Sequence, residues 1–148
     1  MERLLIALAV VAVAAMVSEV IRRRRPVDPP MQGGHEVPSQ LDRSDFEGDG
    51  WLVAVFTSAS CSTCADVVRK AEVVRSDDVA VSTVPYQDRR DLHERYAIDA
   101  VPCLVVADAE GVVHAGFLGP VTATDLWAAV ANARKPGLIE HDCDGGGS

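Results

Sequence analysis

A chain of 148 residues has room for one domain of about 100 to 120 residues with extensions, and little room for a second. Its net charge is −8, and the part after residue 25 holds nine basic against twenty acidic residues. Such an acidic domain repels phosphate backbones, so the composition argues against nucleic acid as a partner.

The N-terminal segment is apolar over residues 4–21, which would span roughly 27 Å as a helix. This length predicts a single-pass membrane anchor, with its basic flank, over residues 1–25. Four arginines follow at 22–25, and because positive charge is retained in the cytoplasm, we expect the domain on the cytoplasmic side. The alternative is a cleaved signal peptide, for which Ala12-Val13-Ala14 offers a small-residue site. The arginine block after the apolar run, with no net charge before it, favours the retained anchor.

Residues 26–40 hold four prolines and two glycines, a composition that predicts a linker with room for a short edge strand near its end. The domain is expected over 41–134. Residues 135–148 combine a proline, four glycines and several acids, which predicts a flexible acidic tail.

Inside the domain, strand-like and helix-like patterns alternate. Short apolar, β-branched runs predict strands, and helically spaced apolar residues from Val67 to Val74 predict an amphipathic helix. Thr122 and Asp125 form a capping pair for the last helix. The predicted order is strand 51–57, helix 64–75, strand 79–84, helix 88–96, strand 101–107, strand 111–117 and helix 122–134. It implies a βαβ unit, a hairpin and a closing helix, and so an α/β fold built as a three-layer α/β/α sandwich.

Two cysteines lie where the first strand meets the first helix. The N-terminus of a helix stabilises a thiolate, so Cys61 is expected to be the nucleophile, with a pKa below the free value of about 8.5. Cys64 follows one turn later on the same face and can resolve a mixed disulfide. Metal binding and an inert structural pair are the alternatives.

A zinc site usually needs a second close pair of ligands, and neither Cys103 nor Cys143 supplies one. We therefore expect no metal and no cofactor other than the redox-active Cys61–Cys64 pair. The histidines are scattered, and each is expected to be a solvated surface group: His35, His93, His114 and His141.

From about residue 41 to residue 134 the chain resembles the thioredoxin family. The run VAVFTSASCSTC at 53–64 is similar to the family's strand leading into its CxxC. YAIDAVP at 96–102 is similar to the stretch that ends in the family's cis-proline loop, and LGP at 118–120 resembles the glycine turn before the last helix.

The resemblance implies that Pro102 is a cis residue facing the dithiol and that the backbone of Val101 pairs with the substrate. Taken alone, Pro102 could be an ordinary proline at a strand entry. The resemblance also places Ser60, Ser62 and Thr63 at the substrate surface, where the family has Trp before the first cysteine and Gly-Pro between the two.

Three further positions depart from the family or add to it. Val55 occupies the place of the family's buried Asp, which accepts the proton of the resolving thiol; without it, release of the mixed disulfide is expected to be slow. Cys103 follows Pro102 and is interpreted as a buried apolar residue, or alternatively as a third thiol near the dithiol. Cys143 could reach a partner or be an incidental thiol.

These residues together predict a membrane-tethered thiol–disulfide oxidoreductase. Its expected partners are proteins that contain disulfides and a dithiol donor, with reduction as the direction if the domain is cytoplasmic. The alternative is a redox-sensing or metal-holding adaptor that uses the same cysteines without turnover.

Overall fold

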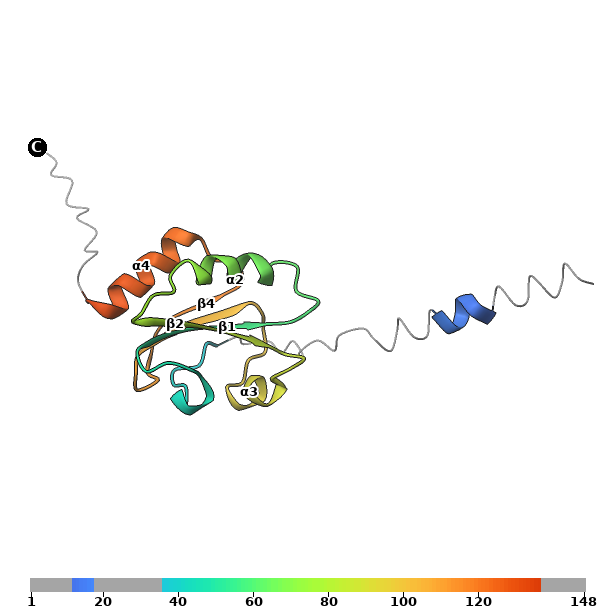
Figure 1. Cartoon of the computed structure of the whole chain (residues 1–148), viewed down its shortest axis with the longest axis horizontal. Coiled ribbons are helices and arrows are strands. Elements are labelled where there is room, and N and C mark those ends of the chain that lie inside the picture. Colours follow the sequence, from blue (N-terminus) through green and yellow to red (C-terminus); the bar gives the residue numbers. More distant parts are fainter. Residues whose placement is uncertain (1–11, 18–35, 137–148) are drawn as a thin grey trace, which may run out of the picture.

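The computed structural model describes residues 12–17 and 36–136 (Figure 1). Residues 36–136 form a four-stranded sheet with helices on both faces. The elements in chain order are the 3-10 helix η1 (Arg43–Asp45), β1 (Trp51–Thr57), α2 (Cys64–Glu72), β2 (Val79–Pro85), α3 (Arg90–Arg95), β3 (Cys103–Ala107), β4 (Val113–Leu118) and α4 (Ala123–Arg134).

The sheet is mixed, with strand order β2-β1-β3-β4. β1 pairs in parallel with β2, and α2 is the crossover helix that connects them. β3 is antiparallel to both β1 and β4. The C-terminal end of β1 therefore lies beside the N-terminal end of β3, with Phe56 opposite Cys103. The segment that follows β1 and the segment that precedes β3 are therefore at the same end of the sheet.

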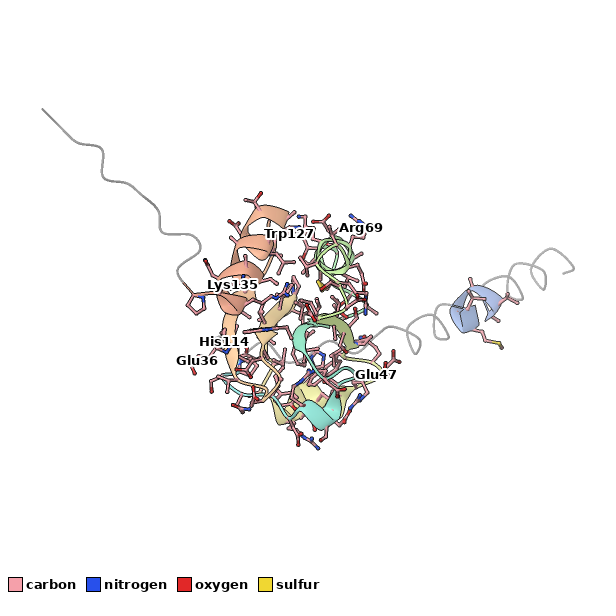
Figure 2. The ribbon with its side chains drawn as sticks, turned by 60° about the vertical axis from the view of Figure 1, so that its left-hand side comes forward. Glu36, Glu47, Arg69, His114, Trp127 and Lys135 are labelled. Atoms are coloured by element: carbon pink, nitrogen blue, oxygen red, sulfur yellow. A yellow bond between two sulfur atoms is a disulfide. The ribbon has the colours of Figure 1, made fainter. Side chains whose placement is uncertain are left out.

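Side chains on β1 alternate between two apolar clusters. Val53 and Val55 face the cluster beneath α2 and α4, while Leu52, Ala54 and Phe56 face the cluster shared with α3. Figure 1 shows α2 and α4 on one side of the sheet and α3 on the other, and Figure 2 shows Arg69 and Trp127 projecting from the first of these layers. The predicted three-layer arrangement is thus observed.

The predicted order of strands and helices is confirmed, and the differences lie at element ends. α2 ends at Glu72 rather than at residue 75, and α3 is shorter than the predicted 88–96. β3 begins at Cys103 instead of residue 101, since Pro102 has no N–H to give to a strand ladder.

Residues 39–41 contact the start of β4 and the turn before it. Leu41 N donates to Gly111 O (2.8 Å), Val113 N donates to Ser39 O (3.0 Å), and Gln40 forms an isolated bridge with Val112. The end of the predicted linker therefore adds a short pairing to this edge of the sheet.

The predicted anchor lies mostly outside the described residues. Residues 12–17 are helical and exposed. Across the two described stretches, 12–17 and 36–136, no helix has the length and apolar character needed to cross a membrane. The rest of the 4–21 segment, the arginines at 22–25 and Cys143 in the tail fall outside those stretches.

Candidate active site

The two cysteines of the CxxC sequence are joined by a disulfide at the start of α2. β1 ends at Thr57, a turn covers the next residues, and Cys64 is the first residue of α2. The Cα atoms of Cys61 and Cys64 are 5.5 Å apart. Cys64 is only 4% exposed, whereas Cys61 is partly exposed. A large partner can therefore approach Cys61 more readily than Cys64.

The charges in the first turn of α2 also bear on the disulfide. A helix N-terminus carries about half a positive charge, which favours an anionic sulfur beside it. Asp66 would oppose that effect, but its carboxylate is bound by Lys70 (2.6 Å) and Arg69 (2.9 Å). The hydrogen bond from Lys70 is the main reason that the pKa of Asp66 is lowered. The two basic side chains thus offset the acid in the first turn of α2.

Gln87, in the connection from β2 to α3, holds the turn that precedes Cys61. Its side-chain Oε1 accepts from Ala59 N (3.1 Å), and its Nε2 donates to Ser58 Oγ (3.2 Å). Ser58 O in turn accepts from Cys61 N (3.1 Å). Through these two bonds, the side chain of Gln87 joins the segment after β2 to the segment after β1, beyond the last paired residue Thr57. No motif in the sequence marks Gln87, which the sequence analysis missed.

The loop containing Pro102 lies at the same end of the sheet as the disulfide. The Val101–Pro102 peptide bond is cis, as the resemblance implied. Gly119 N donates to Pro102 O (2.8 Å), which ties the LGP turn to this loop. Ser60, Ser62 and Thr63 are exposed around the disulfide, and Val101 is partly buried. The fold therefore brings together the segments that the resemblance assigned to the site, while their roles in substrate binding stay a prediction.

Cys103 belongs to the opposite face of the sheet. It is fully buried in the cluster that contains Phe56 and Leu92, whereas α2 covers the other cluster. Burial raises the pKa of Cys103 to about 12, with a smaller contribution from Asp99. This environment fits the interpretation as a buried apolar residue, and the alternative of a third thiol near the dithiol stays a prediction.

The position where the family has a buried Asp is apolar here. Val55 is fully buried in the cluster with Val67 and Leu104, and no Asp or Glu is buried among the described residues. The described residues therefore supply no buried carboxylate where the family has its Asp.

The prediction that each histidine is solvated is wrong for His93. This residue of α3 is 1% exposed, because α3 turns it toward the sheet between the rings of Phe56 and Tyr86. Its Nε2 donates to Val84 O (2.9 Å). His114 is exposed and binds Asp108 (2.7 Å), and the other two histidines lie outside the described residues.

Burial of His93 predicts a pH-dependent stability. Desolvation lowers the pKa of His93 below its usual 6.5, against smaller opposing effects of the Val84 hydrogen bond and Asp91. The unfolded chain then binds a proton below about pH 6.5 that the folded chain does not, so the free energy of unfolding falls on acidification, by at most about 1.4 kcal/mol per pH unit. His93→Gln keeps a donor for Val84 O and does not titrate. Urea unfolding should show that the free energy of unfolding falls less between pH 7 and pH 5 in this variant than in the unaltered protein. An equal fall would mean that His93 is not responsible for the pH dependence.

Residues 12–17 and 36–136 contain no group of three or more His, Cys, Asp or Glu side chains placed to hold a metal ion.

Comparison with known proteins relates the chain to others through structure. No protein-family model and no curated protein matches its sequence. A malarial protein is 14% identical with a TM-score of 0.51, over 56% of this chain and 96% of its own. The germline-specific thioredoxin Deadhead of Drosophila melanogaster is 21% identical with a TM-score of 0.50, over 57% of this chain and 81% of its own. At these identities the likeness shows the fold, which is thioredoxin-like.

Proposed function

We propose that this chain of thioredoxin-like fold is a thiol–disulfide oxidoreductase. The observation that carries the proposal is the Cys61–Cys64 disulfide at the N-terminus of α2, with Cys61 partly exposed and the cis Val101–Pro102 bond at the same end of the sheet. A disulfide that only stabilised the fold would gain nothing from an exposed sulfur at a helix N-terminus. A redox-active one needs both features.

The reaction transfers two electrons and two protons from the reduced dithiol to a disulfide of a partner protein. The Cys61 thiolate attacks one partner sulfur, the partner S–S bond breaks, and the departing partner thiolate takes up a proton. Cys64 then loses its proton and attacks Cys61 Sγ, which releases the second partner thiol and forms the Cys61–Cys64 disulfide. An external dithiol donor regenerates the reduced form. Because Val55 is apolar, the proton of Cys64 passes to solvent, which is expected to slow the second step.

The sequence supports further proposals about location. The apolar segment at 4–21 would tether the domain to a membrane, and the arginines at 22–25 would keep it on the cytoplasmic side. Cytoplasmic thiol pools keep cysteines reduced, so the proposed direction is reduction of partner disulfides.

Reduction of insulin by the full-length protein in detergent, with dithiothreitol as the donor, tests the proposal. We expect precipitation of the insulin B chain to be faster than with dithiothreitol alone. Two results would sink the oxidoreductase: no acceleration, or a stoichiometric metal retained by the reduced protein in place of turnover. The second would support the adaptor.

A further inference from the structure

Thr63 precedes α2 but does not cap it in the usual way. An N-cap threonine normally has extended backbone angles and accepts a hydrogen bond from an N–H of the first helical turn. Thr122 does so at α4, with φ −83° and ψ 153°, and its Oγ1 accepts from Asp125 N at 3.1 Å. Thr63 instead has φ −94° and ψ −15°, and its side chain makes no cap hydrogen bond. The first-turn N–H groups of Asp66 and Val67 donate to the backbone oxygen of Thr63. The Thr63 hydroxyl is therefore not engaged in capping α2.

The hydroxyl is instead directed at the sulfur of the candidate nucleophile. Thr63 Oγ1 lies 3.7 Å from Cys61 Sγ, within hydrogen-bonding distance for sulfur. In the disulfide, this sulfur is a weak acceptor. Reduction turns it into a thiolate, which carries a full charge and no proton, so the hydroxyl can only donate to it. Hydrogen bonds to charged groups are the stronger ones.

We propose that the Thr63 hydroxyl donates a hydrogen bond to the Cys61 thiolate in the reduced protein. Thr63 is thereby a catalytic residue, because its side chain contacts the reacting sulfur. This inference rests on the proposed function and deepens it, because it assigns a role to one of the two residues between the cysteines. The hydroxyl adds to the effect of the helix N-terminus and raises the fraction of Cys61 that is ionised. It also stabilises the reduced form, so the domain becomes a stronger oxidant than it would be without the hydroxyl.

The test measures the rate of iodoacetamide alkylation at Cys61 of the reduced full-length protein from pH 5 to pH 9, read by mass spectrometry of the Cys61 peptide. Thr63→Val has the same shape without a hydroxyl, and Thr63→Ser keeps the hydroxyl. We expect Thr63→Val to raise the midpoint of the pH profile by about one unit, with about a tenfold lower rate below the midpoint. The equilibrium with glutathione should shift by a similar factor, about 30 mV toward a more reducing potential. Thr63→Ser should behave like the unaltered protein.

Thr122→Val is the matched control, because it removes a hydroxyl that does cap its helix. It should lower the Tm by about 5 °C and leave the Cys61 profile in place, whereas Thr63→Val should move the profile without a comparable loss of Tm. An unchanged midpoint in Thr63→Val overturns the proposal, and so does an equal shift in Thr63→Ser, since the hydroxyl would then not be responsible.

The alkylation profile requires no partner disulfide, so its outcome is independent of insulin reduction. If the protein fails to reduce insulin but Thr63→Val shifts the alkylation profile, the oxidoreductase proposal is overturned and the hydrogen bond from Thr63 stands. If the protein reduces insulin but Thr63→Val causes no shift, the oxidoreductase proposal stands and the role of Thr63 is overturned.

Discussion

Replacing Cys61 with serine should lower the protein-dependent part of insulin reduction by roughly a thousandfold or more, which leaves the rate of dithiothreitol alone. A serine hydroxyl is not ionised at neutral pH and cannot form a disulfide, so neither step of the cycle can begin. Cys61 is also the more exposed of the two cysteines, which makes it the one that a partner reaches. The measurement is the initial rate of insulin precipitation at equal protein concentration.

Cys64→Ser should lose turnover in a different way. Cys61 can still attack, but no second thiol resolves the product, so a mixed disulfide with the partner accumulates and is seen on a non-reducing gel. Cys103→Ala is the control, because Cys103 faces the opposite cluster and should be dispensable for turnover. Loss of turnover in Cys103→Ala, in a protein that still unfolds cooperatively, would contradict the two-cysteine cycle.

The second large effect concerns stability at the turn before β4. Gly111 has φ +83°, and a Cβ added there would lie 2.0 Å from Leu41 O. Gly111→Ala should therefore displace residues 39–41 from this edge of the sheet and expose Leu41, which is now 1% exposed. We expect the free energy of unfolding to fall by roughly 3 to 5 kcal/mol in urea titrations.

Gly119→Ala separates the steric overlap from the backbone conformation. Gly119 has almost the same angle, φ +85°, but a Cβ there meets no atom within 4 Å. Gly119→Ala should therefore lower the free energy of unfolding only by the cost of the backbone conformation, about 1 to 2 kcal/mol. If the two variants lost equal stability, the contact between Leu41 and Gly111 would not be the cause.

The order of elements could be read from the sequence because it depends on local pattern. β1 has the predicted bounds, α4 begins after the predicted cap Thr122, and the CxxC sequence lies at the junction of β1 and α2. Apolar periodicity, caps and turns act over a few residues, so they are visible without the fold.

The sequence by itself therefore determined a small acidic α/β domain with a dithiol at the start of a helix. Only the tertiary structure decided which neighbours surround that dithiol. His93 is buried because α3 packs on the sheet, Cys103 faces away from α2 because of its strand register, and Gln87 reaches Ser58 across 29 positions of the chain. Packing of distant segments sets these contacts, and a local pattern carries no record of which segments meet.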